Sequence, residues 1–392
     1  MRSYCCYSEG YCELAIAKMN IIHVYRTYFP DTQGGLEETV RQICSNTIPY
    51  GAKHRIFTLS RKPEPAILQL PEAEVYRFPL TFEIASCGFS ITGVLGFKKL
   101  VEWADLVHYH FPWPYGDLLH FLCHVRKPTL VSYQSDIIRQ QGLLRLYSPL
   151  QNLFLSRVTK IVTTSPNYLQ SSPVLNSLDT QIEIIPNGLD EKRYSAVSVE
   201  KINEVRERFG TDYFLFIGVL RYYKGLQYLL DAVKDAAFTV LIAGSGPMEK
   251  ELKDQALRLG LQNVQFLGYV EDDEKNALIH EARAIVFPSC ERSEAFGITL
   301  LEGAMFAKPL ITADIGTGTT YINRDRETGL VVAPKDHVSL RAAMETLYGD
   351  KEFALRMGEG ARKRFESLFT GQEMGRRYAG VYRDLLHQVE PA

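Results

Sequence analysis

Two carboxylates, Glu294 and Glu302, stand in the second half of the chain with seven residues between them. The apolar run 284–289 before them predicts a buried strand that enters a loop, and apolar residues after Phe296 recur at helical spacing. Glu294 would then lie in the loop and Glu302 on a helix that Gly297 opens. Free backbone N–H groups at a helix N-terminus favour a phosphate. The stretch could therefore hold an anionic nucleotide and offer two acceptors to hydroxyls, although a surface loop glutamate followed by a solvent-facing helix glutamate has the same spacing.

Two cations, Arg221 and Lys224, lie in the segment Gly218–Gly225, directly after an apolar run that predicts a strand. Ligands of open α/β sheets bind beyond the carboxyl ends of the strands, and two cations among glycines suit a diphosphate. The alternative is an ordinary loop in which both side chains only cap backbone groups. Gly244 begins a Gly-x-Gly pair after the next strand, but no third glycine completes a dinucleotide fingerprint, which disfavours a nicotinamide dehydrogenase.

The elements that must position these residues follow an alternating pattern. A strand at 20–25, a loop with Gly34 and Gly35, and a helix from residue 36 form a βα unit, and a second alternating series starts near residue 213. With 392 residues and two such series, the predicted fold class is α/β, with two consecutive Rossmann-like domains that face each other across a cleft. The predicted division is 1–18 as a non-core extension, 19–195 as the first domain, 196–365 as the second domain, and 366–392 as a helix that returns to the first domain.

Composition excludes several classes of protein. A net charge of −2 gives no field for nucleic acid, and seven scattered cysteines suit a reduced, cytoplasmic setting. No apolar run is long enough to cross a bilayer, and the polar N-terminus is not a signal peptide. Lys98 and Lys99 follow an apolar stretch without acidic residues, and Arg145 and Arg157 lie in another acid-free stretch. Such patches can hold a protein peripherally on the cytoplasmic membrane, although an ordinary amphipathic helix has the same pattern.

The order of these motifs resembles glycosyltransferase family 4, over about residues 19–390. Within the family, the chain looks like bacterial mannosyl- or rhamnosyltransferases that assemble O-antigen and other surface polysaccharides, especially in Val24–Pro30 and Gly316–Thr319. The motifs that carry the resemblance are, in order, Gly34-Gly35, Gly218 to Lys224-Gly225, Gly244-x-Gly246-Pro247, Glu294 with Glu302, and Thr328-Gly329-Leu330.

The resemblance implies a retaining enzyme of the two-Rossmann-domain GT-B type that moves a hexose from a nucleotide diphosphate sugar to a lipid-linked saccharide. It also implies that the donor site lies in the interdomain cleft, with residues 19–195 on the acceptor side and residues 196–365 binding the nucleotide sugar. Mannose from GDP-mannose, or a GDP-rhamnose-type donor, is the expected substrate, with no cofactor. Arg221 and Lys224 would neutralise the diphosphate, Glu294 would accept from a sugar hydroxyl, and Glu302 would accept from the ribose. The remaining donor-binding residues implied are Gly34, Gly35, Gly244, Phe296, Gly297, Ile298 and Thr299. The chain has no Asp-x-Asp pair for a divalent metal, so we expect these cations to serve instead.

Two departures from the family pattern bear on the acceptor side. Gln134 stands where many members have a histidine, so a base role would pass to His110, to Asp136 or to the donor phosphate itself. His110, close to Trp113, is the best acceptor-side candidate and the fourth predicted catalytic residue. The segment 316–320 lacks the glutamate of the family's Gly-Gly-x-x-Glu pattern, which leaves the hydrogen bonding to the sugar there open.

Three alternatives to this function remain open. One is a UDP-sugar-dependent transferase of the same fold, and another is a sugar-nucleotide epimerase, which would need no acceptor. The third is a non-catalytic nucleotide-binding or assembly subunit. The presence of both cations together with both carboxylates argues against the last two.

Overall fold

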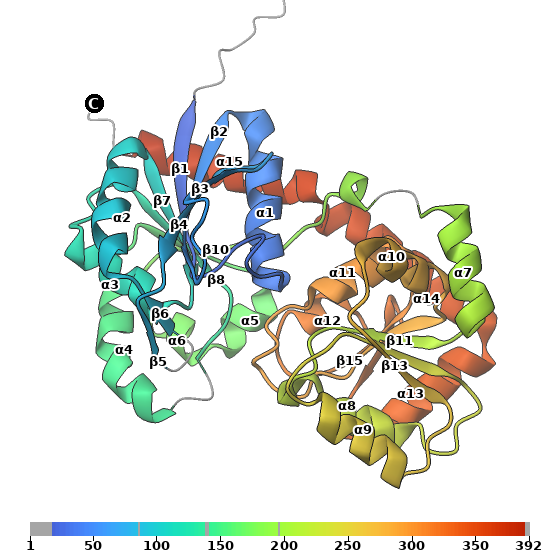
Figure 1. Cartoon of the computed structure of the whole chain (residues 1–392). Helices are drawn as coiled ribbons and strands as arrows, with labels where there is room; N and C mark the ends of the chain where they lie inside the picture. The colour runs from blue at the N-terminus through green and yellow to red at the C-terminus, as the bar shows by residue number, and fades with distance from the viewer. Residues whose placement is uncertain (1–17, 85–86, 138–140, 195–196, 389–392) are drawn as a thin grey trace, which may run out of the picture.

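The computed structural model of the chain describes residues 18–84, 87–137, 141–194 and 197–388 (Figure 1). The predicted extension at 1–18 therefore lies, except for its last residue, outside the described residues. Two parallel α/β units follow one another along the chain, and a helix from the C-terminal end returns to the first unit (Figure 1).

The first unit contains an eight-stranded sheet in which the neighbours are parallel except for one edge pair. Its strands are β1 (Met19–Val24), β2 (Ala52–Ser60), β3 (Ile67–Gln69), β4 (Glu74–Pro79), β7 (Leu106–Phe111), β8 (Thr129–Tyr133), β9 (Lys160–Thr163) and β10 (Ile182–Ile184). They are ordered β10-β9-β8-β7-β1-β2-β4-β3, so the chain reverses direction across the sheet between β1 and β7. A separate hairpin consists of β5 (Phe82–Ile84) and β6 (Cys87–Phe89).

The connections of the first unit are mostly helical, as parallel strands require. They are α1 (Gly35–Thr47), η1 (Ile48–Tyr50), α2 (Ile91–Trp103), α3 (Pro114–Leu122), α4 (Gln141–Leu155), α5 (Pro166–Ser171), α6 (Pro173–Asn176) and the 3-10 turn η2 (Glu191–Arg193). Figure 1 shows α2, α3 and α4 in a row along one side of this unit, with the β5–β6 hairpin beside them.

The second unit contains a six-stranded, fully parallel sheet. Its strands are β11 (Phe214–Ile217), β12 (Val240–Ala243), β13 (Val264–Gly268), β14 (Ala284–Phe287), β15 (Leu310–Ala313) and β16 (Gly329–Val332). The order β13-β12-β11-β14-β15-β16 is that of a Rossmann sheet, which confirms the predicted fold class. Every residue of β11, β12, β14 and β15 is buried, because helices cover both faces of the sheet.

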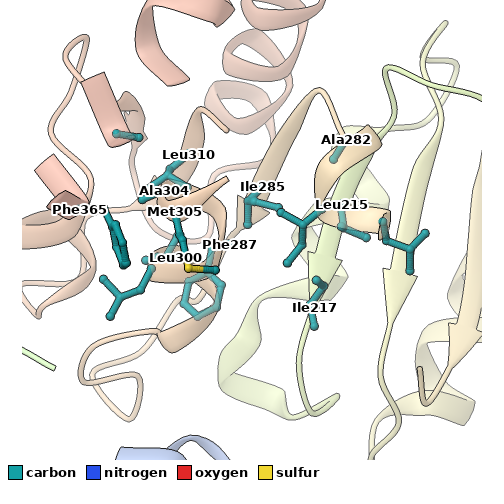
Figure 2. Close-up of a cluster of buried hydrophobic side chains, with 14 of the residues drawn as sticks. Leu215, Ile217, Ala282, Ile285, Phe287, Leu300, Ala304, Met305, Leu310 and Phe365 are labelled. Carbon is teal, nitrogen blue, oxygen red and sulfur yellow. The ribbon is translucent and has the colours of Figure 1, made fainter. Parts of the chain in front are cut away.

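The helices of the second unit position the segment that contains the paired glutamates. They are α7 (Val199–Phe209), η3 (Tyr222–Lys224), α8 (Leu226–Ala232), α9 (Glu249–Arg258), α10 (Asp272–Glu281), α11 (Ile298–Met305), α12 (Thr319–Ile322), α13 (His337–Gly349) and α14 (Lys351–Leu368). Leu300, Ala304 and Met305 of α11 pack into the core that Figure 2 shows, together with Ile285 of β14 and Phe365 of α14. This packing fixes α11 directly behind the carboxyl end of β14.

The last helix, α15 (Gly371–His387), lies beside α1 against the first sheet (Figure 1). Tyr378 and Tyr382 are buried in the first unit's core together with residues of β1, β7 and β8. Where the chain crosses back, the amide of Gly371 donates to the carbonyl of Leu189 at 2.7 Å. The two crossings between the units thus run side by side. Among the described residues, no helix is both long and apolar enough for a membrane span.

Candidate active site

The loop after β11 presents the predicted cations at the point where the order of the second sheet reverses. Arg221 is exposed at the start of η3, and Lys224 ends this short turn. Gly225 has a φ of 71°, and a Cβ there would lie 2.0 Å from the carbonyl oxygen of Pro288. A glycine is therefore required for this loop to press against the loop after β14. Sheet order and close packing together bring the two predicted halves of the site into contact.

Lys224 and Glu294 form a salt bridge across these two loops. Their side chains are only 12% and 11% exposed, and the hydroxyl of Ser289 donates to the same carboxylate oxygen at 3.1 Å. The Lys224 ammonium also lies 4.6 Å from the ring centroid of Phe287. The structure therefore places a cation and a hydrogen-bond acceptor side by side at the carboxyl edge of β11 and β14, where doubly wound sheets bind ligands.

Helix α11 begins beside this pair. Gly297 has a φ of 98°, and the amides of Ile298 and Thr299 lie in the first helical turn, beyond reach of helical carbonyls. The first unit approaches here, because a Cβ on Gly35 would lie 3.5 Å from Cγ1 of Ile298. Gly34 and Gly35 at the start of α1 thus face the start of α11, as the site prediction requires.

Glu302 lies one turn further along α11, on the same side as Ile298. It is 5% exposed, and the Tyr194 hydroxyl donates to its Oε1 at 3.2 Å. Lys275 of α10 forms a salt bridge with the same oxygen at 2.9 Å. Sequence reasoning missed Lys275, because the charged run at 271–275 looks like a solvated helix start.

Two of the predicted donor-binding residues also have a packing role. A Cβ on Gly244 would lie 2.0 Å from the carbonyl oxygen of Gly218, so close packing of two loops requires this glycine. Phe296 is buried in the core, with its ring 6.2 Å from that of Phe369. The side chain of Phe296 therefore belongs to the core, and its backbone is the part that could face a ligand.

The prediction that His110 reaches the acceptor is wrong. The side chain is 1% exposed, and its Nε2 lies 2.9 Å from Nδ1 of His23. His23 in turn pairs with His54 at 3.0 Å, and the rings of His23 and His110 are stacked at 17°. Burial lowers the pKa of His110 to about 3, so this imidazole is neutral at ordinary pH. His110 therefore belongs to a buried histidine cluster and not to the cleft: His23 hydrogen-bonds to His54 and His110, and the ring of His108 packs against those of His23 and His110.

Two groups of buried side chains in this cluster have ligand atoms close enough to surround a metal ion: His23 with His108 and His110, and His23 with Cys44 and His54. The geometry favours hydrogen bonding instead. The 2.9 Å contact with His110 and the 3.0 Å contact with His54 already pair both nitrogens of His23.

A second contact between the units, missed from the sequence, lies near Glu294. Arg292 donates to Oδ2 of Asp136 at 3.1 Å, and the other oxygen of Asp136 accepts from Tyr133 and Ser172 at 2.7 Å each. With both oxygens engaged in this way, Asp136 is held as an interdomain anchor rather than as a free base. Gln134, at the position where many family members have a histidine, is 7% exposed.

An open cavity of about 950 Å³ lies next to this anchor and spans both units. The first unit contributes Arg145 of α4 and Val174 of α6, and the second contributes Cys290, Ile315 and Lys335. Apolar surface with charged groups around it suits an amphiphilic molecule better than a compact polar one. The cavity places such a molecule within a few residues of the Glu294 loop.

Comparison with known proteins agrees with this geometry. Residues 33–193 match the family described as Glycosyltransferase Family 4, and residues 199–364 match Glycosyl transferases group 1. The D-rhamnosyltransferase WbpZ of Pseudomonas aeruginosa is 46% identical over 90% of this chain and 92% of its own length. O-antigen chain mannosyltransferase C of Escherichia coli is 42% identical over 94% of this chain and 99% of its own.

The similarity extends to solved structures. Sucrose-phosphate synthase from Thermosynechococcus elongatus superposes with a TM-score of 0.79 at 18% identity, over 95% of this chain and 100% of the other. At that identity the likeness concerns the fold alone.

Proposed function

Because the chain belongs to glycosyltransferase family 4 and is a sugar-transferring enzyme, we propose that it moves a hexose from a guanosine diphosphate sugar to a lipid-linked saccharide during O-antigen assembly. The donor proposed is GDP-mannose or a GDP-rhamnose-type sugar, since the two relatives are named for mannosyl and D-rhamnosyl transfer. The observation that carries the proposal is the Lys224–Glu294 pair at the reversal point of the second sheet, which the first unit faces.

In this proposal, the donor diphosphate lies between Arg221 and Lys224 on one side and the Gly34-Gly35 turn on the other. The free amides of Ile298 and Thr299 add partial positive charge. This charge matters most when the bond to the sugar breaks, because the leaving nucleoside diphosphate then gains negative charge. The proposal needs no metal ion or other cofactor, because side-chain cations stabilise the leaving group.

Glu294 would accept a hydrogen bond from a hydroxyl of the hexose, and Glu302 would accept from the ribose. The carboxylate of Glu294 is already oriented by Lys224 and Ser289, so little ordering is left for the bound state. An arrangement of this kind holds the anomeric carbon in place while the diphosphate departs.

A group must accept the proton that the acceptor hydroxyl loses during transfer. His110 is buried and Asp136 is engaged with Arg292, so neither of these candidates is free to take it. We assign the role to an oxygen of the departing donor phosphate. The acceptor oxygen forms a bond to the anomeric carbon, the bond from that carbon to the phosphate oxygen breaks, and the proton passes to the phosphate. Attack and departure on one face retain the anomeric configuration.

A lipid-linked acceptor requires access to a membrane, and the first unit has a suitable apolar face. Exposed apolar side chains occur on β5, α2 and α4. Figure 1 shows these three elements on one side of the unit. We define this apolar face by Phe82, Ile84, Ile91, Leu95, Leu146 and Leu153, which are 46% to 81% exposed. Lys98, Lys99, Arg145 and Arg157 are exposed on the same helices or just after them.

Apolar side chains flanked by cations bind an anionic bilayer surface. Helix α4 contributes both to this face and, through Arg145, to the interdomain cavity. We therefore propose a peripheral position on the inner face of the cytoplasmic membrane, with the saccharide end of the acceptor entering the cavity.

A donor screen tests the proposed function. The purified protein is incubated with GDP-mannose, GDP-rhamnose, and UDP-glucose as separate donors, with and without a lipid extract that contains diphosphate-linked saccharides. We expect transfer to lipid from a GDP-sugar, with the anomeric configuration retained. Transfer from the UDP-sugar alone would assign a uridine donor, interconversion of donors without acceptor would assign an epimerase, and no turnover would refute the proposal.

A further inference from the structure

The second sheet's binding edge carries two buried Lys–Glu pairs, and only one of them, Lys224–Glu294, belongs to the diphosphate end of the proposed site. The other joins Lys275 of α10 to Glu302 of α11 at 2.9 Å, with side chains 17% and 7% exposed. Lys275 also bridges to Oδ1 of Asp272 at 2.9 Å. The ammonium is thereby held between two carboxylates, of which only Glu302 is buried.

Lys275 acts on one oxygen of Glu302. Lys275 and the hydroxyl of Tyr194 are the described residues that donate to this carboxylate, and both reach Oε1. Oε1 is therefore occupied by two donors, while the plane of the carboxylate is fixed by them. A ligand hydroxyl that approaches Glu302 would meet Oε2 in a set orientation.

Lys275 also supplies the counter-charge of Glu302. Burial alone lowers the pKa of the Lys275 ammonium, but Glu302 and Asp272 together raise it above its ordinary value. Lys275 is therefore protonated at neutral pH. Because removing one partner of a buried ion pair is strongly unfavourable, the pair keeps both side chains in place.

The position of the pair points to the nucleoside part of the donor. Glu302 lies on the side of α11 that begins with Ile298, next to Gly35 of the first unit. Helix α10 begins four residues after Gly268, which ends β13. Lys275 thus reaches Glu302 from α10, whereas Arg221 and Lys224 belong to the loop after β11.

We propose that Lys275 is the positioning residue for the ribose of the donor nucleotide: by holding Oε1 of an ionised Glu302, it aims Oε2 at the ribose hydroxyls. The inference rests on the proposed function, since it needs a nucleotide donor whose ribose meets Glu302. It assigns Lys275 an effect on nucleotide recognition and none on the transfer step.

The test compares nucleotides that differ only in these hydroxyls. Binding of GDP and of 2′,3′-dideoxy-GDP is measured by titration calorimetry, with UDP and 2′,3′-dideoxy-UDP as a second pair. The variants are Lys275→Met, Lys275→Arg and Lys275→Gln. The control is Lys253→Met, which removes the exposed Lys253–Glu249 pair of α9 in the same domain.

We expect the wild type to bind the ribose nucleotide about tenfold or more tightly than its dideoxy analogue, as for hydrogen bonds to a charged group. Lys275→Met should lose about tenfold in affinity for the ribose nucleotide and almost none for the analogue. Lys275→Arg should keep most of the discrimination, and Lys253→Met all of it.

The outcomes separate the two claims. A wild type that binds neither nucleotide pair, or that binds each pair without discrimination, would refute the proposed role of Glu302 itself. A wild type that discriminates while Lys275→Met discriminates equally would refute the role of Lys275 alone. If Lys275→Met does not fold, Lys275→Gln serves in its place, because it has a shorter and uncharged side chain. Full discrimination between the ribose nucleotide and its dideoxy analogue by Lys275→Gln would then refute the inference as well.

Discussion

Breaking the Lys224–Glu294 pair should affect stability and catalysis in separable ways. Both side chains are almost nine-tenths buried, so Glu294→Gln leaves the Lys224 ammonium without a counter-charge. Removing one partner of a buried ion pair costs about 3–5 kcal/mol, against a total stability of about 5–15 kcal/mol for a typical protein. Lys224→Met should cost a similar amount. The double variant Lys224→Met/Glu294→Gln should recover part of this loss, because neither charge is then left buried alone.

Catalysis should not recover in the same way. In the proposed site, each single variant removes a group that would act on the donor. We therefore expect turnover to fall by a factor of about 10²–10³, as for the loss of one oriented electrostatic contact. The double variant should be at least as inactive. Urea unfolding of the four proteins gives the coupling energy, and GDP-mannose turnover gives the rates.

Two results would refute this reasoning. If the three variants lose stability additively, the two side chains do not act as a pair. If Glu294→Gln keeps wild-type turnover while it is folded, Glu294 does not contact the donor sugar. Glu249→Gln, which removes the carboxylate of an exposed pair on α9, provides the matched control and should change neither quantity.

Three further predictions concern other parts of the molecule. Ile91→Glu combined with Leu95→Glu should weaken co-sedimentation with phosphatidylglycerol vesicles by at least about tenfold, because two exposed apolar anchors are lost. The free energy of unfolding should fall as the pH drops from about 6.5 towards 3, because histidines bind protons in the unfolded chain but stay neutral when buried. His110→Gln should make this pH dependence shallower by up to about 1.4 kcal/mol per pH unit. The same variant should keep turnover at pH 7.5 within about twofold of the wild type. Arg292→Met, which releases Asp136, should lower turnover by about tenfold through weaker closure of the cleft, with little effect on unfolding of either domain.

Each of these predictions has a matched control. Leu257→Glu with Leu355→Glu places two charges at apolar positions that are 81% and 66% exposed on the second unit, and vesicle binding should persist. If the two double variants weaken vesicle binding equally, the apolar face is not the surface that contacts the membrane. The control His337→Gln, at an exposed position, should leave the pH dependence of stability unchanged. A hundredfold loss of turnover in His110→Gln would show instead that His110 is the base. The control Arg324→Met breaks the exposed pair with Glu327 within the second unit and should leave turnover unchanged. If Arg324→Met lowers turnover as much as Arg292→Met does, the interdomain contact of Arg292 is not the cause of the loss.

The sequence allowed the central part of the site to be predicted because that part depends on local patterns. Apolar runs set the strands, and the residues after a parallel strand always lie at one edge of the sheet. Glu294, Lys224 and the Gly297 helix start follow from this rule without knowledge of the partner domain. The strand order β13-β12-β11-β14 then places the two loops next to each other.

The acceptor side could not be predicted in this way, because long-range packing decides it. Strand alternation places His108 and His110 on one face, but nothing local says whether that face meets the cleft or a helix. In the structure α15 covers this face, and Tyr382 of α15 forms a hydrogen bond with His108, 274 positions earlier in the sequence. The Asp136–Arg292 contact is similarly distant, with 156 positions between the partners. Lys275 was missed for the same reason, since the burial of a charged helix start is decided by Tyr194 and Glu302.

Because α15 returns to the first sheet, the first domain cannot complete its core until the end of translation. Met374, Tyr378 and Leu385 pack in the same core as Met19 and Ile21, so the beginning of the chain shares its interior with the end. A ribosome has to complete nearly the whole chain before this interior can close. The second domain has all of its strands some forty residues earlier, and Phe365 of α14 completes its core just before α15 is made. Nascent chains that stall before α15 should therefore expose the inner surface of the first domain to chaperones.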